Sequence, residues 1–144
     1  MTTAFSALAA GIVTLLEASP AVSPRISRAA TQPLPEQAAN MVVVRLIGSA
    51  GDAYAQAGAP VNWDTTIAVE CYARSTADAP DTAVDALLQA VAARILADET
   101  LGGAAAGLAN ERRIEWDFES HGQNVACATF TFTARHTTGG NAIT

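Results

Sequence analysis

Four residues with reactive side chains lie close together in the segment VNWDTTIAVECYARS, which spans residues 61–75. They are two carboxylates, a thiol and a guanidinium: Asp64, Glu70, Cys71 and Arg74. A thiol with a nearby acid or base can serve as a nucleophile, and paired carboxylates can bind a hard divalent cation. Either chemistry requires the side chains to point to the same side of the backbone, so the local structure decides between them.

The same segment alternates between apolar and polar side chains, which is typical of a strand with one buried face. Cys71 falls on the apolar parity with Ile67 and Val69, whereas the three charged residues fall on the polar parity. The parity therefore predicts that the thiol points into the core and the acids point away from it. This excludes a shared active site and leaves the charged side of the strand as a candidate contact surface for another subunit.

A second group of carboxylates alternates along a later segment, at Glu115, Asp117 and Glu119. If the two strands were neighbours, these acids could join Asp64 and Glu70 in a Mg²⁺ or Ca²⁺ site. The alternative is a solvated or subunit-facing sheet surface in which the acids pair across strands with arginines, namely Arg45, Arg74, Arg113 and Arg135. Cross-strand charge pairs are the usual content of such a face, so we expect no bound metal and no other cofactor.

Enzyme motifs are absent from the sequence, which contains no phosphate-binding loop, no dinucleotide-binding glycine motif and no GxSxG. A Cys127–His136 nucleophile–base pair can be written down, but nothing in its spacing supports it. The two cysteines form neither a CxxC nor a Cys/His cluster that would bind zinc, and both fall in strand-like segments where we expect them to be buried. A disulfide between them stays open. We expect a protein that is not an enzyme.

The composition is that of one acidic domain. The chain has 144 residues, half of them hydrophobic, with eight cationic side chains against fourteen acidic ones and a formal net charge of −6. Half-hydrophobic composition at this length supports a buried core. Affinity for the DNA backbone depends on cations that neutralise phosphates, and the chain has no basic run. We therefore expect it not to grip nucleic acid.

Hydrophobic periodicity predicts an α+β fold in which a mainly antiparallel sheet of about four strands packs against two helices. The expected order is α–β–β–α–β–β with a long hairpin arm between the first two long strands, and a short strand at Arg25–Arg28 would add a fifth. The N-terminal apolar segment is expected to be an amphipathic helix rather than a signal peptide, because no cation precedes Arg25. Residues 1–136 form the expected domain, and residues 137–144 are expected to be a flexible tail.

The order and wording of these segments resemble those of the tail terminator proteins of long-tailed bacteriophages and prophages, which are also called minor tail or tail-completion proteins. The resemblance lies in the leading amphipathic helix, the WDT…IAVECYAR strand, the VDALL helix and the EWDF strand, and it covers nearly the whole chain. None of these segments is a catalytic signature.

The resemblance implies a structural subunit that forms a hexameric ring at the head-proximal end of the tail tube, ends tube polymerisation and provides the surface that joins the head. Its implied partners are other copies of itself, the tail tube protein and a head-completion or connector protein. DNA would pass through without being gripped, no membrane is involved, and the protein would lie in the virion tail after synthesis in the bacterial cytoplasm. The arm at Ser49–Pro60 would contact neighbouring subunits or the tube.

The family provides no residue-level motif to carry over, so the interface candidates are chosen from the charged strand face and the arm: Arg45, Asp52, Tyr54, Asp64, Glu70 and Arg74. Three alternatives remain. The chain could be another head–tail connector, neck or tail tube subunit. It could instead be a small α+β ligand- or metal-binding domain with a pocket lined by Asp64, Glu70 and Glu115, or a scaffold domain with no site at all.

Overall fold

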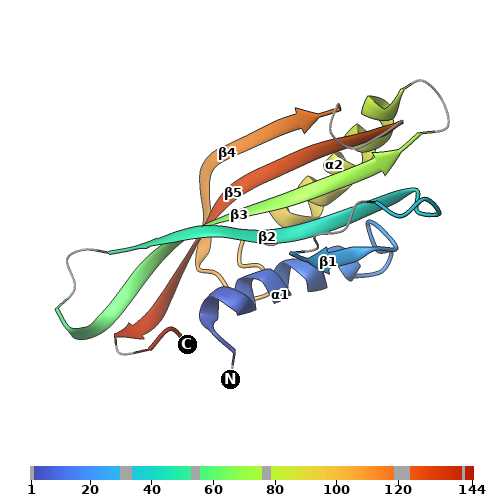
Figure 1. Ribbon diagram of the computed structural model, residues 1–144. Helices are drawn as coiled ribbons and strands as arrows, with labels where there is room; N and C mark the ends of the chain where they lie inside the picture. Colours follow the sequence, from blue (N-terminus) through green and yellow to red (C-terminus); the bar gives the residue numbers. More distant parts are fainter. Residues whose placement is uncertain (1, 30–33, 53–55, 76–78, 119–123, 141) are drawn as a thin grey trace.

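The computed structural model of the chain describes residues 2–29, 34–52, 56–75, 79–118, 124–140 and 142–144. Its elements follow in the order α1 (Ala4–Glu17), β1 (Ile26–Arg28), β2 (Asn40–Gly51), β3 (Gly58–Arg74), α2 (Pro80–Leu96), β4 (Gly107–Asp117) and β5 (Val125–Gly140). The strands form one sheet in the spatial order β1-β2-β3-β5-β4, and both helices pack on the same face of it (Figure 1).

The predicted α+β class with two helices is confirmed, but the sheet differs from the predicted one. It has five strands rather than about four, and it is mixed, because β1 pairs in parallel with β2 while every other neighbouring pair is antiparallel. The fifth strand, β1, is three residues long and lies within the short strand that the sequence suggested at Arg25–Arg28. The last strand, β5, lies between β3 and β4, a position that the order along the chain does not reveal.

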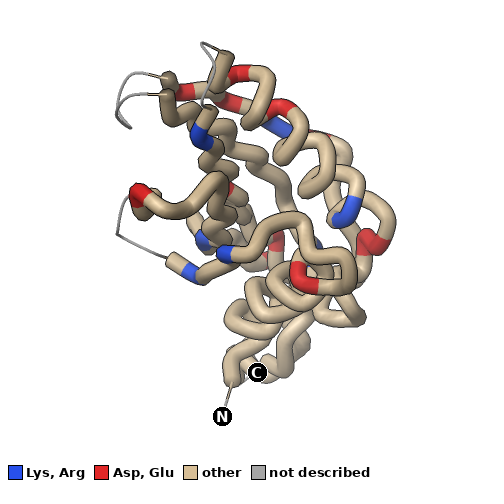
Figure 2. The backbone as a smooth tube through the Cα atoms, turned by 90° about the vertical axis from the view of Figure 1, so that its right-hand side faces the viewer, with Lys and Arg blue, Asp and Glu red and all other residues tan. Residues whose placement is uncertain are grey.

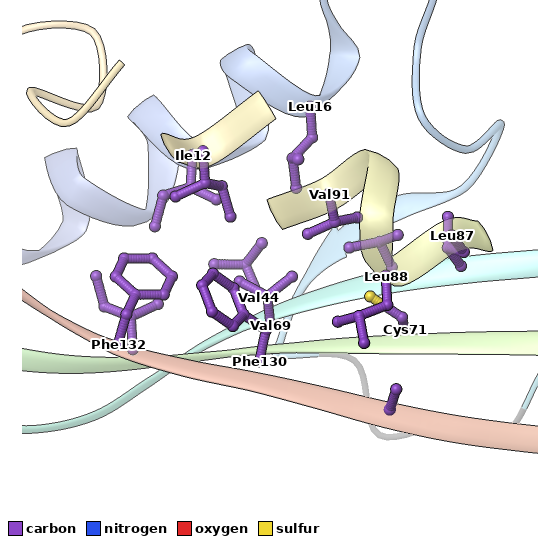
Figure 3. Packing of buried hydrophobic residues seen from close by; sticks show 14 of the residues in the cluster. Ile12, Leu16, Val44, Val69, Cys71, Leu87, Leu88, Val91, Phe130 and Phe132 are labelled. Carbon is purple, nitrogen blue, oxygen red and sulfur yellow. The ribbon is translucent and has the colours of Figure 1, made fainter. Parts of the chain in front are cut away.

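The core lies between the sheet and the two helices (Figure 3). α1 contributes Leu8, Ile12 and Leu16, which are fully buried, and it begins at Thr3, whose hydroxyl accepts a hydrogen bond from the backbone N–H of Ser6. The apolar parity of the sheet meets these helices, with Val44, Val69, Phe130 and Phe132 at the centre. The predicted inward direction of Ile67, Val69 and Cys71 is therefore confirmed.

Arg94 of α2 ties the two helices together. Its guanidinium donates hydrogen bonds of 2.7–2.8 Å to the backbone oxygens of Leu15, Ala18 and Pro20 at the end of α1. The last carbonyls of a helix have no partner within it, and a cation there also complements the helix dipole. These hydrogen bonds fix α1 at its C-terminal end.

Neither described helix is long and apolar enough to span a bilayer.

An arm formed by β2, β3 and β5 extends beyond the helices (Figure 1). The sequence predicts an arm at Ser49–Pro60, and both ends of this segment are strand, because β2 continues to Gly51 and β3 begins at Gly58. β5 also runs further than the predicted end at His136, to Gly140, so residues 137–140 of the predicted tail belong to the sheet. A Cβ on Gly140 would lie 2.2 Å from the carbonyl carbon of Gly58, so this close approach of strands requires glycine.

Candidate interaction surfaces

The charged face of the sheet, on the side away from the helices, carries an internally paired group of three side chains. The Nε of Arg45 donates to Oε1 of Glu70 at 2.5 Å, and the hydroxyl of Tyr72 donates to the other carboxylate oxygen at 2.5 Å. Burial and the hydrogen bond to Glu70 both raise the pKa of Tyr72. This arrangement matches the predicted cross-strand pairing of charges, and it joins two of the six interface candidates.

The remaining interface candidates are spread along the sheet. Asp64 pairs with Arg135, whose Nε lies 3.3 Å from the carboxylate, and it is six residues from Glu70 on one strand, or roughly 20 Å. Arg74 lies at the far end, where its Nη2 donates to the backbone oxygen of Leu34 at 3.5 Å. Asp52 lies on the arm and its N–H donates to the oxygen of Asn62, whereas Tyr54 lies outside the described residues.

The structure does not assemble the alternative metal or nucleophile sites. Glu70, Glu115 and Asp117 line a shallow hollow of about 640 Å³, but Asp64 does not reach it. No group of His, Cys, Asp and Glu that could hold a metal ion occurs among the described residues, which leave out Glu119. Burial raises the pKa of the Cys71 thiol to about 12, so it stays protonated at neutral pH.

The two cysteines are also unconnected to each other and to the histidine. Both are free and buried, as expected, and they lie on opposite faces of the sheet, since Cys71 is paired with the core residue Ala128 and Cys127 with Tyr72. Cys127 and His136 are nine residues apart on β5, which is roughly 30 Å in a strand. The structure therefore does not bring this nucleophile–base pair together.

Large hydrophobic side chains of β4 are exposed on the helix side of the sheet. Ile114 pairs with Phe130 and Trp116 with Ala128, so both side chains point to the helix side of the sheet. Nevertheless Ile114 is 40% exposed, Trp116 is 51% exposed and Phe118, directly after the strand, is 46% exposed. We refer to Ile114, Trp116 and Phe118 as the β4 stripe. Half of the large hydrophobic residues that are exposed in the described chain belong to it.

The β4 stripe is exposed because two helices cannot cover five strands. α1 packs on β1 and β2, and α2 packs on β3 and β5, which leaves β4 without a helix. A helix with its side chains is about 10 Å wide, and neighbouring strands are about 4.8 Å apart, so each helix covers about two strands. The alternation of these three residues is visible in the sequence, but only the sheet order reveals their exposure.

The base of the arm is joined to α1 by an aromatic contact. The ring of Phe5 lies edge-on to Trp63 and to His136, with centroid distances of 5.2 and 5.0 Å. Nε2 of His136 lies 2.7 Å from the hydroxyl of Thr65, and the indole N–H of Trp63 donates to Thr138 at 2.9 Å. The backbone N–H of Ala4 donates to the oxygen of residue 143, which lies near the C-terminus. These contacts fix the direction in which the arm leaves the sheet.

We expect His136 to make the stability of the chain depend on pH. Its imidazole is buried, its Nδ1 has no hydrogen-bond partner among the described residues, and burial lowers the pKa of His136 below its ordinary value. Below about pH 6.5 the unfolded chain then binds a proton that the folded chain does not, so the free energy of unfolding falls with pH by up to about 1.4 kcal/mol per unit. Above that pH the contribution is constant.

The measurement is chemical denaturation of the wild type and of His136→Gln at several pH values between 5 and 8. The variant should be less stable at pH 8 but should show a smaller loss between pH 6.5 and 5. Equal slopes in the two proteins would show that His136 titrates with an ordinary pKa.

Comparison with known proteins adds one distant similarity. No protein-family model matches the chain, and no curated protein matches it. Among solved structures, the chain is similar to the sheath/tube terminator of PVC, an extracellular contractile injection system, in its extended state. The TM-score is 0.44 at 14% sequence identity, over 94% of this chain and 57% of that one. The chain thus spans little more than half of that protein, and a similarity this low does not establish a shared fold.

Proposed function

We propose that this chain is a structural, non-catalytic subunit of a phage-type tail, and that it is a tail terminator that closes into a ring on the head-proximal end of the tail tube. The observation that carries the proposal is the β4 stripe, three large exposed hydrophobic side chains of which two lie on an edge strand and the third directly follows it. Exposed apolar side chains on an unpaired edge are avoided in proteins that work as monomers. Such an edge is expected of a subunit that is completed by assembly.

Three further features support a terminator in particular. The sequence resembles that family in the order and wording of its elements. The arm of β2, β3 and β5 extends beyond the helices, where it can reach a neighbouring subunit or the tube (Figure 1). The net charge of −6 disfavours binding to the DNA backbone, which suits a ring through which DNA must pass without being held.

The proposal separates this chain from a tail tube subunit and from an enzyme. A terminator stops at a single ring, whereas tube subunits continue to stack. Two kinds of reactive group were candidates for catalysis, the thiols and the carboxylates. Among the described residues, burial keeps both thiols protonated, and Glu70 of the charged face pairs with Arg45. The partners that the resemblance implies are other copies of this chain, the tube protein and a head-completion protein.

Negative-stain electron microscopy of the concentrated, purified protein tests the proposal. We expect closed rings of uniform diameter, six-fold if the resemblance to the family holds. Long stacked tubes would identify a tube subunit instead. A chain that stays monomeric alone should form the same rings when it is mixed with purified tube ends, and failure in both conditions would contradict the proposal.

A further inference from the structure

α1 presents an outer surface that has almost no charge. No charged residue occurs in its first thirteen positions, and the only one in the helix is Glu17 at its end. The helix that starts beside the N mark is uncharged along most of its length (Figure 2). The positions that point outward include Ala10 and Thr14, with Val13 and Leu15 half-buried. The exposed positions of α1 are small or polar, so an apolar neighbour could approach this side with few charges to desolvate.

The uncharged outer side of α1 and the β4 stripe lie at opposite edges of the sheet. α1 packs over β1 and β2 at one edge, and the β4 stripe lies at the other. The β1 and β4 edges have no strand beyond them among the residues that the structure describes. Each subunit therefore has a helix beside its β1 edge and no helix beside its β4 edge.

The strand directions allow these two edges to meet. β1 is parallel to β2, and the three pairings from β2 through β3 and β5 to β4 are all antiparallel. β4 consequently runs opposite to β1. If the sheet of one copy continued into the next with the helices on the same face, β4 would lie beside β1 as an antiparallel neighbour, with the usual ladder of backbone hydrogen bonds.

We propose that β4 of one copy pairs with the β1 edge of the next copy, whose α1 then covers Ile114 and Trp116. This inference rests on the proposed function and identifies the contact that builds the ring. The contact is heterologous, because each copy uses two different edges, and heterologous contacts are the kind that generate rings. The sheet would be continuous from subunit to subunit.

The charges at the two edges are complementary. β4 carries three acids and two arginines, and one of the arginines, Arg113, lies 2.5 Å from Glu115 of the same strand. The β1 edge carries Arg25 and Arg28, both exposed, and residues 21–29 contain no acid. Opposite charges at facing edges favour the correct partner and speed its encounter. A contact of β4 with its own copy would lack Arg25 and Arg28 and would leave Ile114 and Trp116 without a covering helix.

Site-directed crosslinking tests this pairing in the full chain. Arg112 lies on β4, is exposed and pairs with the core residue Phe132, so it points to the same face as Trp116 and can be replaced while Trp116 is kept. Arg112→Cys and Arg28→Cys are made separately, and each is treated with a short bis-maleimide, alone and after coexpression of the two. Both native cysteines are buried, so the wild type serves as the blank. We expect covalent dimers from the coexpressed pair and none from either variant alone.

A second measurement uses the exposed aromatic itself. Trp116→Ser should weaken self-association by roughly 30-fold or more, as truncation of a central interface tryptophan does. Ile143→Ser is the matched control, because Ile143 is 53% exposed but lies away from β4, and its association should not change. Both positions are exposed, so the variants should fold as the wild type does.

Three other results would contradict the proposed pairing of β4 with the β1 edge of the next copy. Crosslinking of Arg112→Cys with itself would show that β4 meets β4, and unchanged association of Trp116→Ser would place the contact elsewhere. A chain that remains monomeric and uncrosslinked at every concentration and on tube ends would also contradict it. The proposed function fails separately: a chain that crosslinks as expected but has no effect on tail length would keep this contact and lose the terminator role.

Discussion

Gly11→Ala should destabilise the chain by about 1–3 kcal/mol, although the same change in an open helix stabilises it by about 1 kcal/mol. Gly11 lies in the middle of α1, and a Cβ built on it would lie 2.2 Å from the backbone oxygen of Leu101. The opposing atom belongs to the main chain, so no side chain can rotate away from it. α1 would have to move away from the turn after α2, and the core between them would open.

The control is Ala10→Gly, the reverse change at the exposed neighbouring position. It should cost about 1 kcal/mol through helix propensity alone, which calibrates that effect within the same helix. Urea denaturation of the three proteins gives the comparison. If Gly11→Ala proved more stable than the wild type, the close packing of α1 on residue 101 would be wrong.

Much of the fold could be predicted because its signals are local. The alternation along β3 correctly separated Cys71 from Glu70, and hydrophobic periodicity correctly predicted two helices. Both patterns extend over more than a dozen residues. The short strand suggested at Arg25–Arg28 is present as β1, but its parallel pairing with β2 was not predicted, because three residues carry no period. The end of β5 was misplaced, because the glycine- and threonine-rich residues 137–140 resemble a tail until their partner strand is known.

The candidate surface could be predicted only in part. Pairing of Arg45 with Glu70 follows from charges on neighbouring strands, and the structure confirms it. Exposure of Ile114 and Trp116 could not be deduced from their alternation, since a strand with one apolar face looks the same whether or not a helix covers it. What distinguishes the two cases is the sheet order, which places β4 beyond the reach of both helices.

Removing this chain from a phage or prophage that encodes it should abolish control of tail length. In the proposed role, subunits continue to add to the growing tube until a ring occupies its end, so tubes without the ring should stop only when subunits are exhausted. The β4 stripe makes this expectation specific, because a chain that cannot close the ring should not cap the tube. Complementation with Trp116→Ser should therefore fail, whereas complementation with Ile143→Ser should succeed.

The decisive measurement is the distribution of tail lengths in electron micrographs of particles made with and without this chain. We expect one narrow peak when the wild-type chain is present, and a broad distribution extending to much longer tubes when it is absent. Tails of the same narrow length in both preparations would contradict the proposed role as a terminator.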